Sequence, residues 1–162
     1  MAGNDKLYGG AGDDKLIGGG GNRHPDTMSG GGGADTFVYL EPDGELGVQQ
    51  FWDYIADYNF GEGDKVDVSG IDTNLSLPGD QAFTIVTRFS GTGPGEIYSN
   101  IFGTFPYPGA PSVVYHGYVH ADIDGDGRSD LTIQVGAASY HQETLYFSNH
   151  STSGSKKIEP RF

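Results

Sequence analysis

Large apolar residues recur singly and at a fixed interval through the first part of the chain. They are Leu7, Leu16, Met28 and Phe37, and most of the residues between them are glycine or polar. The interval is nine residues from Leu7 to Leu16 and again from Met28 to Phe37. One apolar residue in each nine-residue unit is typical of a three-residue strand that alternates with a six-residue turn. We therefore expect residues 2–40 to form stacked coils with these four side chains inside.

Each turn between these strands carries glycines and ends in an aspartate, in the pattern G-G-x-G-x-D-x-U-x, where U is the apolar residue. Glycine suits such sharp turns because a positive φ costs it little. The pattern is a known calcium-binding repeat of parallel β-helices. Two repeats make one coil, so turns two repeats apart should stack about 4.8 Å apart. Aspartates and carbonyls from two stacked turns can then surround one ion with oxygen atoms, which Ca²⁺ prefers.

The repeats are not in perfect register. The inserted residues 23–25 lengthen the third turn, and the first turn lacks its leading glycine pair. The second and fourth turns therefore form the better predicted calcium site, and the first and third turns form a weaker or distorted one. The predicted ligands are Gly9, Gly10, Gly12, Asp14, Gly30, Gly31, Gly33 and Asp35 in the better site, and Gly3, Asn4, Asp5, Gly19, Gly21 and Asp26 in the weaker one. A flexible linker is the alternative, but a linker needs no apolar residue at a fixed phase.

A second acidic motif, D-x-D-x-D-G-x-x-D, occupies residues 122–130. It matches the first nine positions of an EF-hand calcium loop, including the glycine at the sixth position. The twelfth position is Ile133 rather than glutamate, so the bidentate ligand is missing, and the flanking segments are predicted strands. The predicted ligands are the carboxylates of Asp122, Asp124, Asp126 and Asp130 and the carbonyl of Arg128. Four carboxylates this close repel each other unless a cation lies among them; an ordinary solvated turn is the alternative.

These motifs and the segments around them resemble a known family. The repeats are similar to those of RTX proteins, secreted bacterial proteins whose nonapeptide arrays form calcium-loaded β-rolls. The later segments IADYNFGEGDKVDVSGID, GDQAFTIVTRFSGTGPGEIYS and HADIDGDGRSDLTIQV look like the C-terminal domain of serralysin-type metalloproteases. The same type of domain occurs as the R-modules of alginate (mannuronan) C5-epimerases. The resemblance covers roughly residues 2–147 and departs at residues 23–25, 41–50 and 103–111.

The pattern and the resemblance together predict an all-β fold, a parallel β-roll of RTX nonapeptide repeats continuing into an antiparallel β sandwich-like cap. The expected parts are the roll over residues 2–40, the cap of the same domain over 41–147 and a polar tail over 148–162. The resemblance implies that this tail is an uncleaved secretion signal; a disordered tail or a cloning remnant is an equal alternative. Expected strands lie at 37–40, 51–58, 65–68, 81–86, 96–98, 112–120, 131–135 and 145–147, with a turn at 91–95 and no amphipathic helix. The second of these strands also fits a helix turn, and the resemblance favours the strand.

Two more acidic residues follow the repeats. Asp64 and Asp67 lie in a block where the resemblance implies acidic residues that complete a calcium site. A turn residue and an exposed strand residue, respectively, are equally good interpretations.

Charge and composition narrow the functional classes. The 162 residues carry 22 acidic and 9 basic side chains, a net charge of −13, and no cysteine. A chain this acidic repels nucleic acid and anionic membranes, so neither is an expected partner. The charge also opposes folding unless cations bind, and without disulfides bound metal is the expected source of stability. No apolar run is long enough for a Sec-type signal or a membrane span.

Familiar catalytic motifs are missing from the sequence. There is no H-E-x-x-H zinc motif and no G-x-S-x-G nucleophile elbow, and the five histidines form no zinc-ligand spacing. We therefore expect no enzyme activity in this chain alone. Aromatic residues are plentiful, and sheet packing is the favoured explanation for them. A sugar-stacking surface is the alternative, with Trp52, Tyr54, Tyr107, Tyr115 and Tyr118 as its candidate residues.

Three functional hypotheses follow, all of which treat the chain as part of a longer secreted protein, because it opens within a repeat. The first is a non-catalytic calcium-binding module that folds on Ca²⁺ outside the cell, after passage through type I secretion machinery, and stabilises that protein. The second is a carbohydrate-binding module, like an alginate epimerase R-module, that modulates an attached enzyme. The third is the cap domain of an RTX adhesin. The expected partners are calcium, the exporter, an attached catalytic or adhesin domain and, in the second hypothesis, a polysaccharide.

Overall fold

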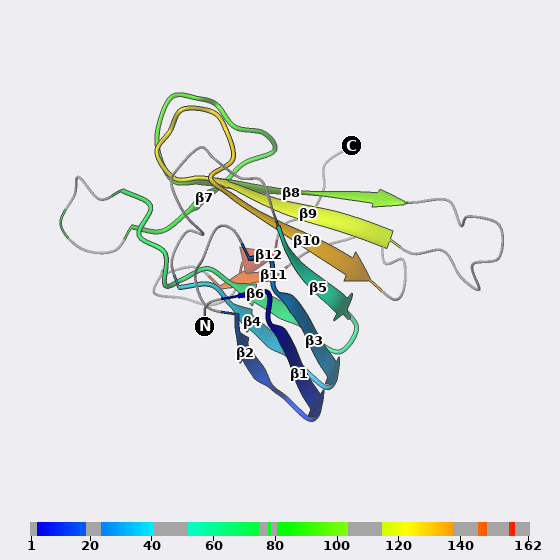
Figure 1. The fold of residues 1–162 in the computed structure, drawn as a ribbon. Helices are drawn as coiled ribbons and strands as arrows, with labels where there is room; N and C mark the ends of the chain where they lie inside the picture. The colour runs from blue at the N-terminus through cyan, green and yellow to red at the C-terminus, as the bar shows by residue number, and fades with distance from the viewer. Residues whose placement is uncertain are drawn as a thin grey trace.

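The computed structural model is an all-β protein, as the sequence predicts. It describes residues 3–18, 24–40, 52–74, 78, 81–103, 115–137, 146–148 and 156–157. These ranges contain twelve strands and no helix, and therefore no helix that could cross a membrane. The strands form two sheets (Figure 1), which we call sheet A and sheet B.

Sheet A has seven strands in the order β1-β3-β5-β10-β9-β8-β7, and sheet B has five in the order β12-β11-β6-β4-β2. The strands of sheet A are β1 (Lys6–Ala11), β3 (Thr27–Gly32), β5 (Asp53–Tyr58), β7 (Thr84–Ile85), β8 (Glu96–Gly103), β9 (Tyr115–Asp122) and β10 (Leu131–Ala137). Those of sheet B are β2 (Lys15–Ile17), β4 (Thr36–Val38), β6 (Lys65–Asp67), β11 (Tyr146–Ser148) and β12 (Lys156–Lys157). The chain therefore alternates between the two sheets from β1 to β6.

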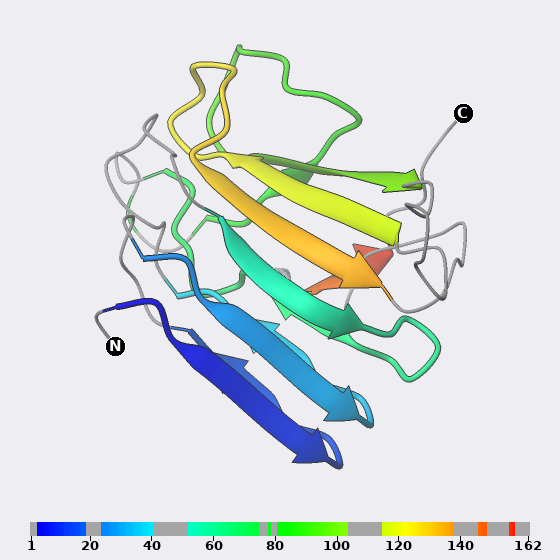
Figure 2. The same cartoon turned by 45° about the vertical axis from the view of Figure 1, so that its right-hand side comes forward.

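The first six strands form a roll of three coils, each with one strand in sheet A and one in sheet B (Figure 2). β1, β3 and β5 pair in parallel, and so do β2, β4 and β6. Leu7 is paired with Met28, and Leu16 is paired with Phe37. Met28 and Phe37 are fully buried, Leu16 is 5% exposed, and Leu7 packs partly buried against the same core. The predicted inward positions are confirmed.

The third coil, β5 and β6, extends the roll beyond the glycine-rich repeats. Ile55 is paired with Met28 in sheet A, and Val66 is paired with Phe37 in sheet B. Both are fully buried, so each continues the apolar column of its sheet. The two strands predicted for this part of the chain are confirmed, and β5 is a strand rather than a helix turn.

Sheet A continues from the roll into the predicted antiparallel part without interruption. β10 pairs in parallel with β5, and β9 and β8 then add to β10 in antiparallel pairing. The inner face of this part buries Ile97, Val119, Ile133 and Val135 in the same core as the roll. The expected cap is therefore present, and it covers the β5 side of the roll.

Several strand lengths differ from the sequence predictions. The strand predicted at 96–98 is the eight-residue β8, because it pairs with β9 along its whole length. The strand predicted at 81–86 is reduced to the two residues of β7, which pair with the first two residues of β8. The last repeat strand ends at Val38 instead of running to Leu40, which is 52% exposed. Each of these lengths is set by the neighbouring strand with which the segment pairs. Local composition does not reveal that neighbour.

Strands from the end of the chain complete sheet B. β11 pairs in parallel with β6, which confirms the closing strand predicted at 145–147. β12 lies within the predicted polar tail, residues 148–162, and pairs antiparallel with β11. The loop predicted at 41–50, and all but the first residue of the loop predicted at 103–111, lie outside the described residues.

Candidate metal centres

Two ladders of aspartates run across the coils. The first aspartate ladder, Asp5, Asp26 and Asp53, lies where the chain enters the strands of sheet A. The backbone N–H of Asp5 donates to Oδ1 of Asp26 at 2.8 Å, and the N–H of Asp26 donates to Oδ1 of Asp53 at 2.8 Å. Backbone bonds between neighbouring coils hold the same stacking, since Thr27 N–H donates to the carbonyl of Asp5 at 2.9 Å. Each coil therefore places its aspartate next to that of the following coil.

The second aspartate ladder, Asp14, Asp35 and Asp64, lies where the chain enters the strands of sheet B. The N–H of Asp14 donates to Oδ1 of Asp35 at 2.9 Å, and the N–H of Asp35 donates to Oδ1 of Asp64 at 2.9 Å. Oδ2 of Asp64 accepts the N–H of Asn59 at 2.7 Å. The structure thus brings the predicted pair Asp14 and Asp35 together and adds Asp64 as a third rung.

Three ladder carboxylates keep one oxygen without a hydrogen bond. Oδ2 of Asp5, of Asp14 and of Asp35 is buried and has no hydrogen-bond partner among the described residues. The whole Asp35 residue is only 1% exposed. A buried carboxylate oxygen without a partner is costly, because it has lost water and gained nothing in exchange. A bound cation is the natural way to satisfy all three atoms.

Carboxylate and carbonyl oxygens pack directly against the glycines of the turns around the second ladder. A Cβ added to Gly9 would lie 2.6 Å from the carbonyl oxygen of Gly30 and 2.8 Å from Oδ2 of Asp14. A Cβ added to Gly30 would clash with Oδ2 of Asp35. The glycines of the repeat therefore let carboxylate and carbonyl oxygens, the donors that calcium prefers, approach the backbone more closely than any side chain would permit.

The positive φ angles of the repeat glycines aim carbonyls into the stack. Gly10, Gly12, Gly31 and Gly33 have φ of 112°, 112°, 99° and 124°. A Cβ on Gly31 would clash with the carbonyl oxygen of Gly10, and one on Gly33 would clash with that of Gly12. The carbonyls of the second turn thus point at the fourth turn. Residues other than glycine rarely adopt this backbone conformation, and their side chains would block the close approach of the two turns.

Burial and mutual repulsion make the second ladder electrostatically unfavourable without a cation. Burial raises the pKa of Asp35, and the nearby carboxylates of Asp14, Asp57 and Asp13 raise it further. Burial likewise raises the pKa of Asp64, with Asp35 and Asp57 adding to the effect. Backbone N–H donors to both carboxylates offset part of these shifts. A divalent cation would favour the ionised form of every one of these groups.

The donor set fits calcium better than a transition metal. Each second-ladder ligand candidate is a carboxylate or a backbone carbonyl, and no sulfur ligand exists because the chain has no cysteine. Hard oxygen donors select Ca²⁺ or Mg²⁺, and irregular cages assembled from main-chain carbonyls suit the flexible coordination of Ca²⁺. Asp14, Asp35 and the carbonyls of Gly10 and Gly30 are the groups that would hold the ion.

The turns around the first ladder are described only in part. Asp26 is 5% exposed, and a Cβ on Gly18 would lie 3.0 Å from its Oδ2. Nδ1 of His24, from the inserted residues, lies 3.2 Å from Oδ1 of the predicted ligand Asn4. Gly3 has a φ of 131°, as its predicted turn position requires. The other predicted ligands of this site, Gly19 and Gly21, lie outside the described residues.

Two aspartates of the site were not predicted from the sequence. Asp53 forms the third rung of the first ladder. Asp57 accepts the N–H groups of Gly30 and Gly31, both at 3.0 Å, and the hydroxyl of Ser29 at 2.6 Å. Neither lies in a glycine-rich repeat, so the nonapeptide pattern gave no signal for them. Only the register of β5 against β3 places them beside the repeat turns.

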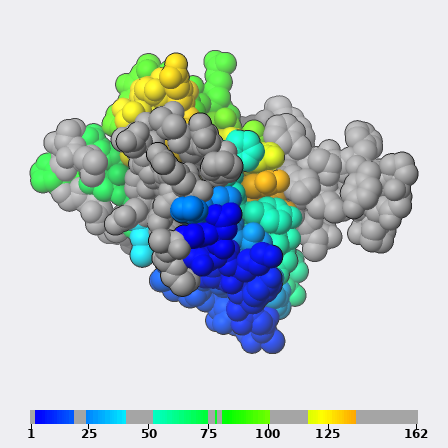
Figure 3. Space-filling model, viewed as in Figure 1, coloured from blue at the N-terminus to red at the C-terminus, as the bar shows by residue number. Residues whose placement is uncertain are grey.

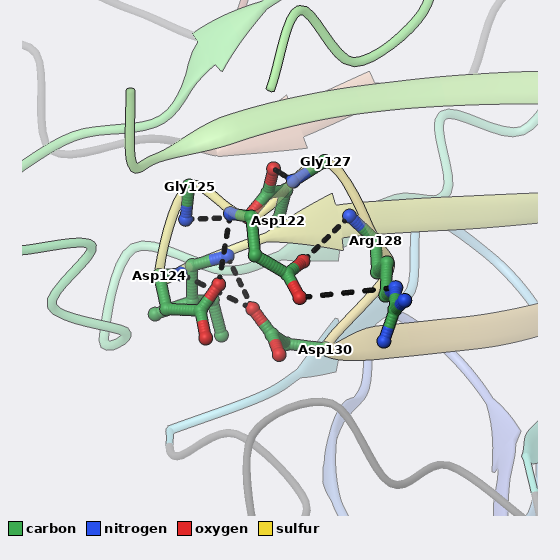
Figure 4. A network of polar contacts seen from close by, with 8 residues as sticks. Asp122, Asp124, Gly125, Gly127, Arg128 and Asp130 are labelled. Atoms are coloured by element: carbon green, nitrogen blue, oxygen red, sulfur yellow. Dashed lines mark hydrogen bonds and ion pairs between the residues drawn. The ribbon is translucent and has the colours of Figure 1, made fainter. Parts of the chain in front are cut away.

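A third group of carboxylates lies in the acidic loop, residues 122–130, which joins β9 to β10 (Figure 4). Carboxylate oxygens of Asp122, Asp124 and Asp130 lie within 4.8 Å of one another. Asp122 accepts the N–H of Gly125 at 2.6 Å and that of Gly127 at 2.8 Å. Burial raises the pKa of Asp122, and the carboxylates of Asp130 and Asp124 add to this effect against those two hydrogen bonds.

Asp130 is the acidic-loop residue with an oxygen to spare. It is 2% exposed, and its Oδ2 accepts the N–H of Ile123 at 2.7 Å and that of Asp124 at 3.2 Å. Its Oδ1 is buried and has no hydrogen-bond partner in the described part of the chain. This is the same arrangement as in the ladders. A cation among the three clustered carboxylates would satisfy it.

The carboxylate of Asp126 contacts Arg128 instead of joining this group. Oδ1 of Asp126 accepts the N–H of Arg128 at 2.7 Å, and its Oδ2 lies 3.9 Å from Nε of Arg128. Asp126 is not part of the carboxylate cluster.

Asp67, in β6, accepts the N–H and the hydroxyl of Ser69 at 3.0 and 2.6 Å and belongs to neither ladder. In Figure 3 the acidic loop (yellow) lies at the opposite end of this view from the N-terminal repeats (blue).

If the acidic loop binds calcium, Asp130→Asn should weaken that binding without disturbing the backbone of the loop. The amide oxygen can keep both hydrogen bonds of Oδ2, while the uncharged amide nitrogen takes the position of Oδ1. We expect a loss of at least about tenfold in affinity at this site, measured by calcium titration with backbone amide NMR shifts as the readout. Asp126→Asn is the matched control and should change the affinity by less than about threefold. Equal losses in the two variants would contradict the placement of the cation.

The fold and the acidic turns together define the class of protein. It is an all-β roll module in which aspartates and backbone carbonyls gather at stacked, glycine-rich turns. The chain belongs to the serralysin C-terminal family of M10 peptidases, because the sequence model of that family matches residues 4–146. The resemblance drawn from the repeats is thereby confirmed.

The chain is similar to several solved structures, one of which matches it over much of its length. It is the solution structure of the AlgE6R3 subunit from the Azotobacter vinelandii mannuronan C5-epimerase, with 27% sequence identity and a TM-score of 0.45. The match covers 82% of this chain and 60% of the epimerase subunit. A search of curated proteins gives no match.

Proposed function

We propose that this chain is a non-catalytic calcium-binding module that folds when it meets Ca²⁺ outside the cell and stabilises a larger secreted protein. The observation that carries the proposal is the set of buried carboxylate oxygens without partners. Asp14 and Asp35 in the second ladder and Asp130 in the acidic loop all have one. Each lies beside further acidic side chains, where only a cation would offset the cost of burial.

The charge of the chain makes calcium a condition for folding. The net charge is −13, from 9 basic and 22 acidic side chains. Ca²⁺ ions at the two ladders and the acidic loop would offset about 6 of these charges, two for each ion. Because the sites do not exist in the unfolded chain, their binding free energy adds to the free energy of folding.

This coupling supports a role in export. Extracellular calcium modules typically bind with a Kd of about 10⁻⁴ to 10⁻³ M. At the much lower free calcium of the cytosol such a chain stays loosely folded, as passage through a type I exporter requires, and folds at its destination. The catalytic or adhesive activity then belongs to an attached domain of the parent protein.

Calorimetric titration of the metal-free protein with CaCl₂ tests the proposal. We expect saturable heat with more than one equivalent of Ca²⁺ and a midpoint in the submillimolar to millimolar range. The same concentration of MgCl₂ should give little heat, because Mg²⁺ demands a regular octahedron and gives up its water reluctantly. Absence of saturable calcium binding would refute the proposal.

A further inference from the structure

Asp57, near the end of β5, is an aspartate outside both ladders that holds the start of the fourth turn. Its Oδ1 accepts the N–H of Gly30, and its Oδ2 accepts the N–H of Gly31, both at 3.0 Å. Oδ2 also accepts the hydroxyl of Ser29 at 2.6 Å. Both oxygens of this carboxylate are therefore engaged by donors of β3, whereas the second ladder keeps buried oxygens that have no hydrogen-bond partner among the described residues.

A local irregularity of β5 accompanies the placement of Asp57. The register of β5 against β3 puts Asp57 level with Gly30, the first glycine of the fourth turn. Against β10 the register shifts just here, since β5 has one residue more than β10 between two neighbouring pairs, Ile55 with Val135 and Tyr58 with Ala137. Such an extra residue re-aims the side chains beside it. The next residue, Tyr58, is buried in the core, and Asp57 is half-buried with its carboxylate turned to β3.

The hydrogen bond from Gly31 to Asp57 fixes the direction of the carbonyl of Gly30. The Gly31 N–H and the Gly30 carbonyl belong to one peptide unit, and in a trans peptide these two groups point in opposite directions. Asp57 accepts the N–H on the side of the third coil. The carbonyl therefore faces the second turn, where a Cβ added to Gly9 would lie 2.6 Å from its oxygen. This carbonyl is one of the groups that would hold the ion.

The two glycines make this anchor important. Gly31 has a φ of 99°, and glycine has more accessible backbone conformations than any other residue. A peptide between two glycines can therefore rotate its carbonyl away from the second turn unless something holds it. Because Asp57 binds the N–H groups of two successive residues, it restrains the backbone on both sides of Gly30.

We propose that Asp57 is a positioning residue of the calcium site, which orients the Gly30 carbonyl through the Gly30–Gly31 peptide and does not touch the ion. The proposal rests on the function proposed above, because it requires calcium at the second ladder. Groups that orient metal ligands contribute about 10- to 100-fold to metal affinity. The competing explanation is that Asp57 only adds negative charge near the ion.

Asp57→Asn and Asp13→Asn form a matched pair that separates orientation from charge. Burial raises the pKa of Asp35, and the carboxylates of Asp57 and Asp13 are both among those close enough to raise it further. Each substitution thus removes one negative charge near the site. Asp13 accepts a single N–H, that of Ala34 at 2.9 Å through Oδ1, and an asparagine keeps this bond. Asp57 needs both oxygens, and an amide nitrogen cannot accept a glycine N–H.

Calcium titration followed by amide NMR is the test. At the second ladder we expect Asp57→Asn to lose about tenfold or more in affinity and Asp13→Asn to lose less than about threefold. At saturation the calcium-induced shift of the Gly31 amide nitrogen, which is bonded to the carbonyl carbon of Gly30, should shrink in Asp57→Asn and stay native in Asp13→Asn. A residue that only stabilises the fold would leave this shift unchanged in the saturated protein. The acidic-loop amides should titrate as in the native protein in both variants.

Equal effects of the two asparagine substitutions, or a full Gly31 shift in saturated Asp57→Asn, would overturn the positioning role while leaving the calcium site intact. Absence of saturable shifts in the second and fourth turns of the native protein would refute the calcium site itself, and this proposal with it. If Asp57→Asn does not fold in saturating calcium, Ser29→Ala replaces it, because it removes only the hydroxyl that donates to Oδ2 of Asp57. Ser29→Ala should lower the affinity by about two- to fivefold, and an unchanged affinity would overturn the proposal.

Discussion

Asp35→Asn is expected to lower calcium affinity at the second aspartate ladder by at least about 100-fold. Asp35 is the central rung, and its Oδ2 is a buried atom with no hydrogen-bond partner in the described part of the structure. The asparagine can keep the hydrogen bond from Asp14 N–H to Oδ1, so the backbone stack is retained. The substitution removes the negative charge of Asp35 and the oxygen atom that would face the cation. Residues that only support a metal ligand contribute about 10- to 100-fold in affinity, and a ligand itself should contribute more.

The same substitution should change the metal-free protein in the opposite direction. The folded-state pKa of Asp35 is raised, so the ionised carboxylate destabilises the folded chain as pH rises through that value. A neutral amide removes this penalty, and the thermal midpoint without calcium should stay equal or increase. Calorimetry and melting curves with and without CaCl₂ measure both effects. Glu62→Gln, which removes an exposed charge from the turn just before Asp64, is the matched control; if it behaves like Asp35→Asn, general charge rather than coordination is responsible.

Gly31→Ala is expected to cost the folded protein about 3 kcal/mol or more. Its φ of 99° is unfavourable for alanine, and such strain costs about 1–3 kcal/mol. A Cβ at this position would also clash with the carbonyl oxygen of Gly10, so the second and fourth turns would have to move apart. The carbonyl and carboxylate oxygens of the two turns would move apart with them.

Two neighbouring substitutions separate the strain from the clash. Gly10→Ala has the strain of a φ of 112° but no heavy atom within 4 Å of its Cβ. Gly32→Ala has neither a positive φ nor a close contact. Chemical denaturation in saturating calcium should therefore rank the loss of stability as Gly31→Ala, then Gly10→Ala, then Gly32→Ala. A similar loss in all three would mean that the turns are not stacked as described.

The repeating part of the fold was predictable because its information is local. One apolar residue in each nine-residue unit was enough to identify Leu16, Met28 and Phe37 as core residues. The aspartate at the sixth position of the repeat was enough to predict the stacking of Asp14 and Asp35. Both patterns repeat because each coil packs its apolar side chains and its turns in the same way as the coil before it.

The continuation of the roll was less predictable because its sequence no longer repeats. The turn before Asp64 has Asn59 and Phe60 where the fourth turn has Gly30 and Gly31. Asp57, from the strand before that turn, accepts the two glycine N–H groups. Nothing local shows that this carboxylate lies there, since its neighbours come from a segment 26 to 27 residues earlier in the chain.

The cap was also hard to predict from local sequence, because its strands pair across larger separations along the chain. β5 and β10 are neighbours in sheet A, although Ile55 and its partner Val135 are far apart in sequence. β8 has eight residues because β9 offers a partner over its whole length, and the local sequence suggested only three.

Far-ultraviolet circular dichroism during thermal melting, with calcium and then with a chelator, tests the central claim most directly. At a calcium concentration 100 times its Kd, each site adds about 2.7 kcal/mol to the stability of the fold. Several sites together then supply a large share of the roughly 5–15 kcal/mol that stabilises a typical domain. The predicted result is loss of the β signal on chelation and its return with Ca²⁺ but not with equal Mg²⁺. An identical melting curve with and without the chelator would contradict calcium-driven folding.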